Sequence, residues 1–332
     1  MTLTCATAEL AAMAAVVPQG TEATVEQILL WVVVPYAALA IFLAGFCCRV
    51  LRWAWSPVPF RIPTTCGQQK SLPWIRPSSL DNPSTGMETV ARMALEILLF
   101  RSLFRNNRAT LRDRQYGFGE DKALWLAALA FHWALLVIVL RHLRLLVDPV
   151  PAFITTMSGW DGYFQFGTPP LYLTDVIAIC AGCYLLVRKL RDPLVRYLSR
   201  WPDYFALLLL LAIAGSGIWM RYFSRVDIVA VKRLALGLAT FHPVVPAGLN
   251  TMFLIHLMLI CTLAAYFPFS KLVHVGGVFL SPTRNLANNN RSKRHINPWN
   301  HPVKTHTYPE WESEFRDKIK AAGIPLDEVQ GD

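Results

Sequence analysis

Hydrophobic residues fall into five long runs along the chain, and polar or charged segments separate these runs. Each run approaches the length of about 20 apolar residues that an α-helix needs to cross a lipid bilayer. We therefore predict an all-α, integral membrane bundle of five transmembrane helices. The predicted spans are residues 28–48, 123–147, 170–188, 204–220 and 250–269.

Three shorter segments between and after these runs also predict helices. "METVARMALEILLFRSLFRN", near the end of the long segment 49–122, has apolar residues at helical spacing with arginines between them. It predicts an amphipathic helix on the membrane surface, because it is too charged to span. Residues 226–241 predict a second surface helix, and residues 311–322 predict a short helix in the tail.

Composition agrees with a membrane protein. Hydrophobic residues make up 54% of the 332 residues and charged residues only 16%, whereas an average soluble domain is roughly 25% charged. Seven cysteines without a regular framework predict no disulfide scaffold. The first 20 residues hold no Lys or Arg, so a cleavable signal peptide is not expected.

The distribution of basic residues predicts the topology. Of the 32 Lys and Arg residues, 26 lie in the alternate segments 49–122, 188–200 and 271–332. The positive-inside rule then places residues 1–27 in the periplasm. It makes residues 28–279 the domain of the cytoplasmic (inner) membrane, with a cytoplasmic loop at 49–122, and residues 280–332 a cytoplasmic tail. Topology and anionic lipid explain the net charge of +10, so no nucleic-acid partner is needed.

Four of the eight histidines lie on the second and fifth spans. His132 and His142 are ten residues apart, or about 15 Å along a helix, and His256 and His274 are eighteen apart, or about 27 Å. Eighteen residues make five full turns, so His256 and His274 share one face of a continuous helix. Antiparallel packing then pairs His142 with His256 in the outer half of the membrane. It pairs His132 with His274 in the inner half.

Two imidazole pairs stacked across a bilayer predict two haems, each with two histidine ligands. A single buried histidine often only hydrogen-bonds a neighbouring helix, but polar residues at this depth are costly and mark function. Zinc is less suitable, because neither pair has further Cys or carboxylate ligands at the right spacing. The lone CxxC of Cys180 and Cys183 favours small-residue packing. No CxxCH occurs, so the haems are expected to be b-type and to carry electrons.

Two arginines beside His142 are candidate partners for haem propionates. Arg141 and Arg144 lie at the outer end of the second span. Anchoring to lipid headgroups is an equally good interpretation of both residues.

The fifth span and the residues that follow it resemble a known family. "FLIHLMLICTLAAYFPFSKLVHVGG" is similar to the closing helix of the gamma subunit of respiratory nitrate reductases, a five-helix dihaem cytochrome b. In that family the ligands on helices two and five are also ten and eighteen residues apart. The resemblance covers roughly residues 25–285. It implies an outer haem on His142 and His256. It also implies an inner haem on His132 and His274.

The long first loop resembles a different branch. "PFRIPTTCGQQKSLPWIRPSSLDNPSTG" and "LFRSLFRN" look more like DsrM, the cytochrome b subunit type of the membrane complex DsrMKJOP in sulfur-metabolising prokaryotes. This resemblance implies a menaquinone pool, a cytoplasmic iron–sulfur partner of the DsrK type and further periplasmic and membrane subunits. It implies an electron-transfer subunit that oxidises menaquinol at the outer side, in a complex linked to dissimilatory sulfite and sulfate metabolism. The tail is then a candidate docking surface for the soluble partner.

The quinol site is less well defined by the resemblance. In the nitrate reductase relatives a lysine after helix two takes part, but residues 148–187 contain no lysine here. A quinol needs a proton acceptor and a hydrogen-bond donor. The candidates on the outer side are Asp161, Lys232 and His242, and each can equally be a surface charge or a loop contact.

Two alternatives remain open from the sequence. The chain can be the cytochrome b subunit of another quinone-linked enzyme, such as a nitrate reductase, hydrogenase or formate dehydrogenase. It can also be a haem-free transporter whose histidines relay protons. A transporter predicts broken helices and repeated halves, and the sequence indicates neither.

Overall fold

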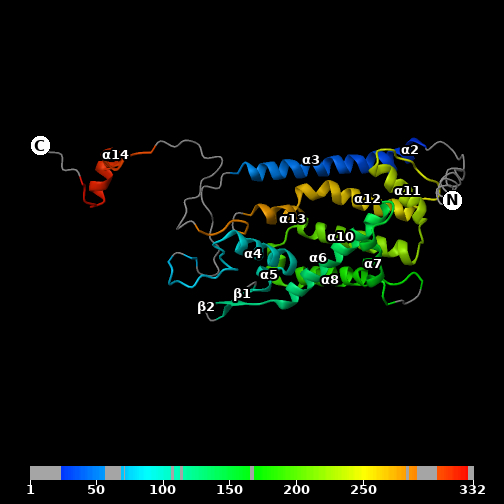
Figure 1. The fold of residues 1–332 in the computed structure, drawn as a ribbon, viewed down its shortest axis with the longest axis horizontal. Helices are drawn as coiled ribbons and strands as arrows, with labels where there is room; N and C mark the ends of the chain where they lie inside the picture. Colours follow the sequence, from blue (N-terminus) through cyan, green and yellow to red (C-terminus); the bar gives the residue numbers. More distant parts are fainter. Residues whose placement is uncertain are drawn as a thin grey trace, which may run out of the picture.

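A computed structural model gives the fold. It describes residues 24–56, 69–70, 72–105, 108–112, 115–164, 168–281, 284–289 and 305–327. Most of the predicted periplasmic segment and about half of the predicted tail lie outside the described residues. Helices make up most of the described residues (Figure 1).

Four helices are long and apolar enough to cross a membrane among the described residues. The first comprises α2 (Val25–Ile28), a π-helical turn η1 (Leu29–Val33) and α3 (Val34–Ala54). The others are α6 (Lys122–His142) with the 3₁₀ turn η2 (Leu143–Leu145), α10 (Trp201–Tyr222), and α12 (Thr251–Tyr266) with η3 (Phe267–Phe269). They coincide with the first, second, fourth and fifth predicted spans. These four helices support the prediction of a membrane protein.

The third predicted span is the helix α8 (Leu173–Arg191), which is less apolar than the other four. Its charged residues lie near its two ends. Asp175 pairs with Arg141 at one end of α6 (Nη2–Oδ1, 2.7 Å), and Arg188 pairs with Asp121 at the other end (Nη2–Oδ2, 3.1 Å). Ion pairs thus join α8 to α6 at both ends. The count of five spanning helices stays a prediction.

Small residues allow α8 to pack closely. Ala178 and Ala181 are buried, and Ala181 belongs to a core with Phe131 and Leu207. A Cβ added at Gly182 would lie 2.7 Å from Leu211 Cδ2 and 3.0 Å from Phe131 Cε2. A larger residue at 182 would therefore displace the side chains of Leu211 and Phe131, so glycine allows α8 to lie close to α6 and α10, as is usual for helix packing in membranes.

The order of packing leaves the two histidine-bearing helices apart. α6 packs on α8, α8 on α10, α10 on α12, and α12 on α3 (Figure 1). Within the described part of the chain, α6 and α12 are not close-packed neighbours.

The fifth helix is broken, which the sequence analysis did not expect. After η3 come Ser270 in an extended conformation, a 3₁₀ turn η4 (Lys271–Val273), a short α13 (His274–Gly277) and η5 (Val278–Leu280). Pro268 has no N–H to donate to the helix. The premise that His256 and His274 lie on one continuous helix is wrong, and so is the expectation of no broken helix.

The connecting elements lie at the two ends of the bundle (Figure 1). One end carries α4 (Gly86–Leu99), α5 (Arg101–Phe104) and an antiparallel hairpin of β1 (Arg108–Arg112) and β2 (Gln115–Gly119), with Arg108 opposite Gly119. The opposite end carries α7 (Ala152–Asp161) and α11 (Ile228–Ala239). The short loop after α8 holds α9 (Pro193–Leu198). The described elements of the basic segment 49–122 that follow α3 therefore lie at the end opposite α7 and α11.

Three of the shorter predictions can now be compared with the structure. The surface helix at 226–241 is confirmed as α11, and the tail helix at 311–322 is confirmed as α14 (Tyr308–Ala321). The amphipathic helix is present as α4 and α5, but Phe100 interrupts it with a left-handed backbone (φ 51°). The described residues are mostly helical, as predicted. The short hairpin of β1 and β2 was not predicted, because two strands of five residues are too short to stand out in a hydrophobic pattern.

Candidate haem sites

The two histidines of the predicted inner pair lie close together, with their rings nearly perpendicular. His132 projects from α6 and His274 is the first residue of α13. Their ring centres are 6.0 Å apart and their planes are inclined by 78°. A bond between a metal and an imidazole nitrogen is about 2 Å long, so one metal ion between two imidazoles holds the ring centres about 6 Å apart. The observed separation fits that arrangement.

The predicted outer pair is also brought together. His142 is the last residue of α6, and His256 lies in the first half of α12. The two rings are within electrostatic reach of each other. His256 is buried, whereas His142 is exposed at the surface of its helix. In each pair one histidine comes from the second predicted span and the other from the fifth or the residues that follow it; that each pair holds a haem stays a prediction.

All four imidazoles use Nδ1 for a hydrogen bond. Three of them donate to backbone carbonyls: His132 to Ala128 (2.7 Å), His142 to Ile138 (2.7 Å) and His274 to Lys271 (2.9 Å). A carbonyl can only accept, so Nδ1 carries the proton in these rings. Nε2 is then the nitrogen with a free lone pair, which is the state that a metal ligand needs.

The fourth histidine reaches the same state through a side chain. Ser216 on α10 donates its hydroxyl proton to the carbonyl of Ile213 (2.9 Å). Its oxygen is therefore left to accept from Nδ1 of His256 (2.8 Å). The loop residue His242 has a comparable bond to the Thr240 carbonyl (2.8 Å). The Nδ1 bond alone is thus not specific, and the pairing across helices distinguishes the four.

Two glycines flank Ser216, the residue on α10 that contacts His256. A Cβ at Gly217 would lie 3.4 Å from Cε1 of His256, and a Cβ at Gly215 would meet nothing within 4 Å.

No group of three or more His, Cys, Asp or Glu residues suited to a metal ion is found in the residues that the structure describes. An imidazole pair is sufficient for a haem, because the porphyrin supplies the iron's other four ligands. The residues present fit a haem at each pair.

The candidate propionate ligand Arg141 is already engaged by the protein. Its guanidinium is buried, lies 3.0 Å from Asp161 and 2.7 Å from Asp175, and stacks 3.8 Å above the ring of Tyr172. Arg221 lies 3.8 Å from the centre of the same ring. These contacts join α6 to α7 and α8. Propionate binding by Arg141 stays a prediction.

The second candidate, Arg144, is close to both Tyr172 and His142. The Arg144 guanidinium therefore lies where it could pair with a negatively charged group, such as a haem propionate, near the outer pair. The same end of the bundle holds Asp175, which is within electrostatic reach of His142.

The three quinol candidates have separate partners. Asp161 is buried and accepts hydrogen bonds from the backbone (2.8 Å) and hydroxyl (2.6 Å) of Thr174. Lys232 pairs with Asp148 at 3.3 Å. His242 is exposed. No contact among the three candidates is found within the described ranges.

The sequence of this chain is similar to those of known proteins. Residues 91–291, which include all four histidines, match the family described as "Nitrate reductase gamma subunit". The chain belongs to the nitrate reductase gamma subunit family. The broad family resemblance seen in the sequence is thereby confirmed.

Two similar proteins have a more specific name. The chain is 46% identical over 275 residues, 81% of its length and 82% of the relative's, to the "Hdr-like menaquinol oxidoreductase cytochrome b-like subunit" of Archaeoglobus fulgidus. It is 40% identical over 306 residues, 90% of its length and 89% of the relative's, to the protein of the same name from Archaeoglobus profundus. The resemblance to DsrM stays a prediction.

Several residues of this gamma-family site were missed by the sequence analysis. Asp175, Tyr172 and Arg221 complete the cluster around Arg141, and Ser216 orients His256. Asp175 had a signal, because a carboxylate inside a predicted span is unusual and marks a buried partner. Ser216 had none, since serine is common in the interiors of membrane helices.

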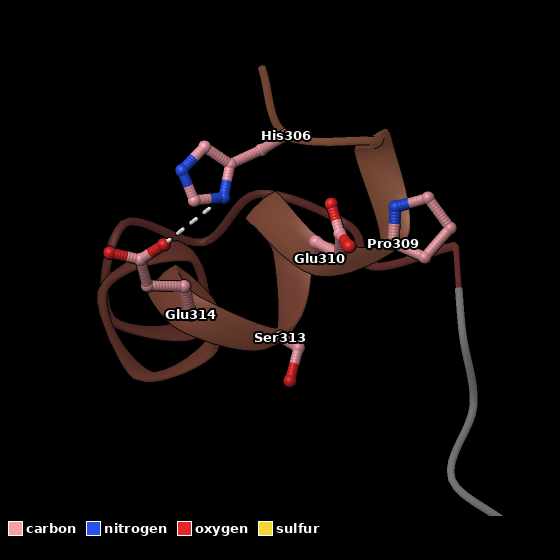
Figure 2. Close-up of a pocket in the computed structure, with 5 residues that line it drawn as sticks. All are labelled: His306, Pro309, Glu310, Ser313 and Glu314. Carbon is pink, nitrogen blue, oxygen red and sulfur yellow. Dashed lines mark ion pairs between the residues drawn. The ribbon is translucent and has the colours of Figure 1, made fainter. Parts of the chain in front are cut away.

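A shallow pocket on α14 does not belong to the haem sites. It has a volume of about 530 Å³ and is lined by His306, Pro309, Glu310, Ser313 and Glu314 (Figure 2). Nδ1 of His306 lies 3.6 Å from Oε2 of Glu314. The pocket is a polar feature of the tail.

Proposed function

We propose that the chain is a dihaem cytochrome b that transfers electrons between menaquinol and a cytoplasmic iron–sulfur subunit. The observation that carries the proposal is the pair of His132 and His274, whose ring centres are 6.0 Å apart. The gamma-subunit family and the names of the two Archaeoglobus relatives support it. Haem bound by each pair supplies one-electron transfer, with no open coordination position for a substrate.

The protein's own part is to hold and orient the four imidazoles. His142 and His256 form the outer pair, and the Nδ1 hydrogen bonds fix each ring with Nε2 available. Such bonds also raise the basicity of a ligand. Arg141 and Arg144 supply positive charge beside the outer pair. In this proposal Arg144 is the better partner for a propionate, because Arg141 already has two carboxylates.

The membrane arrangement in the proposal has five spans, with α8 as the third. Its 19 residues are about 28 Å long, and the ion pairs at both ends reduce the cost of its charges. The basic segments then face the cytoplasm and the N-terminus faces the periplasm. The haem pair of His132 and His274 lies toward the cytoplasmic side.

Menaquinol oxidation belongs at the outer end, where protons are released to the periplasm. Asp161, Lys232 and His242 are the candidate groups there. His242 is the first to test, because its side chain is exposed and its contact with Thr240 leaves Nε2 available. Asp161 has less freedom, since Thr174 and Arg141 engage both of its oxygens. Electron flow toward quinone reduction uses the same residues.

The partner in the proposal is an iron–sulfur subunit of the DsrK type, within a DsrMKJOP-like complex of dissimilatory sulfur metabolism. The resemblance of the first loop to DsrM supports this choice. The name "Hdr-like" of the relatives supports association with other subunits of a membrane oxidoreductase. The exposed tail helix α14 is a candidate part of the docking surface.

A reduced visible spectrum tests the proposal against the transporter alternative, which the break in helix five has made more relevant. The full chain, purified in detergent and reduced with dithionite, is expected to show b-type bands and about two haems per chain. A reduced menaquinol analogue should produce the same bands without dithionite. Protein without such bands contradicts the cytochrome and leaves a haem-free transporter.

A further inference from the structure

The inner ligand His274 lies beyond the break in helix five. Ser270 occupies the break with an extended backbone (φ −108°, ψ 175°) and is buried. Its hydroxyl donates to the carbonyl of Phe267 (2.9 Å), and its oxygen accepts from the backbone N–H of Leu272 (3.1 Å). One side chain thus satisfies backbone groups on both sides of the break, where the regular helix bonds are lost.

Residues at the start of α10 contact the chain on both sides of the break in helix five. Tyr266 donates its hydroxyl to the carbonyl of Pro202 (3.2 Å), just before the break. Just after it, Nζ of Lys271 pairs with Oδ1 of Asp203 (2.7 Å). Asp203 is mostly buried, and its other oxygen accepts from the backbone N–H of Arg200 (3.1 Å). The broken segment is therefore attached to α10 on both sides of Ser270.

This fixed peptide is the one that orients the inner ligand. The carbonyl of Lys271 accepts the Nδ1 proton of His274 (2.9 Å). The direction of Nε2 in His274 thus depends on where residue 271 is held. His256 differs, because it lies inside the regular helix α12 and is oriented by Ser216.

We propose that Ser270, together with the pair of Lys271 and Asp203, positions His274 as the inner haem ligand. Ser270 sets the bend, Asp203 fixes the peptide of Lys271, and that peptide aims Nε2 of His274 at His132. This inference rests on the proposed function, since it assumes that haem is the group held between the two rings. It predicts that disturbing the bend alters the inner haem and spares the outer one.

Single-haem backgrounds separate the two sites. His142→Ala is expected to remove the outer haem, so that only the inner haem remains. His132→Ala is expected to remove the inner haem, so that only the outer haem remains. Ser270→Ala should shift the midpoint potential and the low-spin electron paramagnetic resonance signal of the haem in the first background, and change neither in the second. Ser216→Ala is the matched control and should give the reverse pattern.

Conservative variants distinguish positioning from general damage. Ser270→Thr keeps the hydroxyl and suits an extended backbone, so it should restore the wild-type signal. Asp203→Asn should give a smaller change of the same kind as Ser270→Ala. Equal shifts at both haems, or an unchanged inner haem in Ser270→Ala, overturn the inference.

A readout without haem keeps the two proposals separate. In the full chain with its seven native cysteines replaced by alanine, His132→Cys and His274→Cys can be joined by a short bis-maleimide. Ser270→Ala should lower the yield of this cross-link severalfold, and Ser270→Thr should restore it. A wild-type chain without haem defeats the proposed function, while an unchanged cross-link yield defeats the positioning role.

Discussion

The outer and inner histidine pairs are built from the same residue type but sit in different surroundings. In the outer pair, His142 has Arg141, Arg144 and Asp175 within electrostatic reach. In the inner pair, His132 has aromatic neighbours instead, with Phe100 at 5.0 Å and Phe131 at 6.0 Å between ring centres. Among the described residues, the ring of His274 is the ionisable group that interacts with it.

This difference indicates how each site is controlled. Fixed charges near a redox centre change the relative stability of its two oxidation states, and they act strongly where water is scarce. The outer site is therefore expected to respond to changes of charge. The inner site is expected to respond to packing and to the bend that carries His274. In the proposed cytochrome, the two haem sites are thus controlled by separate residues.

The largest expected effect is the loss of one haem at a time. His142→Ala should reduce the haem content from about two per chain to about one, because the outer iron loses an axial ligand. His274→Ala should do the same at the inner site. Haem content measured after extraction checks both variants. Two haems retained in either variant contradict the ligand assignment.

The next effect concerns the buried charges of the outer end. Arg141→Ala leaves Asp161 and Asp175 without their shared cation, and breaking a buried pair in this way costs about 3–5 kcal/mol of unfolding free energy. The thermal unfolding of the detergent-purified protein checks this. Lys232→Ala is a matched control, because its exposed partner Asp148 (67% exposed side chain) makes a surface pair worth about 0–1 kcal/mol. Equal losses in both variants contradict the comparison.

The end that carries α4 should be sensitive to acid. Hydrogen bonds and charge from Arg101 and Arg105 lower the pKa of Asp81 from 3.8 to about 2. A carboxyl with a lowered pKa stabilises the folded state above its unfolded pKa, and this stability is lost as the pH falls from about 4 to about 2. The shift corresponds to about 2 kcal/mol.

Asp81→Asn should remove the same stability at neutral pH. Limited proteolysis of the loop that contains Asp81, carried out at a series of pH values, checks the prediction. Faster cleavage is expected in Asp81→Asn than in the wild type at pH 7. An acid dependence that is the same in Asp81→Asn and the wild type rules out this residue as its source.

The smallest effect is a shift in potential at the outer site alone. Asp175→Asn removes a negative charge near His142, which favours the reduced haem and raises its midpoint potential. The effect is on the order of 1 kcal/mol at an effective dielectric constant of about 20. A redox titration of His132→Ala, with and without Asp175→Asn, measures it. A fall in potential contradicts the electrostatic account.

The sequence predicted mainly those features that depend on the spacing of residues along the chain. Runs of apolar residues located four long helices. The spacing of His132 and His142 predicted two levels of histidine pairs, and their role as haem sites stays a prediction. The charged ends of α8 were harder to interpret, because Asp175 and Arg188 are compatible with a span only through their partners on α6. Those partners are distant in sequence, so no local pattern contains them.

The bend of helix five shows a second limit. Pro268 alone does not predict a break, since membrane helices often tolerate proline. The break depends on Ser270 and on contacts with the start of α10, which only the packed structure brings together. His274 nevertheless lies 6.0 Å from His132 between ring centres, although the premise of a continuous helix was wrong. The pairing of the four histidines as haem ligands stays a prediction.

A redox titration of the purified wild-type chain, followed at the b-type absorption band, tests the central claim most directly. The account predicts two one-electron steps from two haems, of which one step disappears in His142→Ala and the other in His274→Ala. A spectrum without b-type haem, or a single step that survives both substitutions, would contradict it.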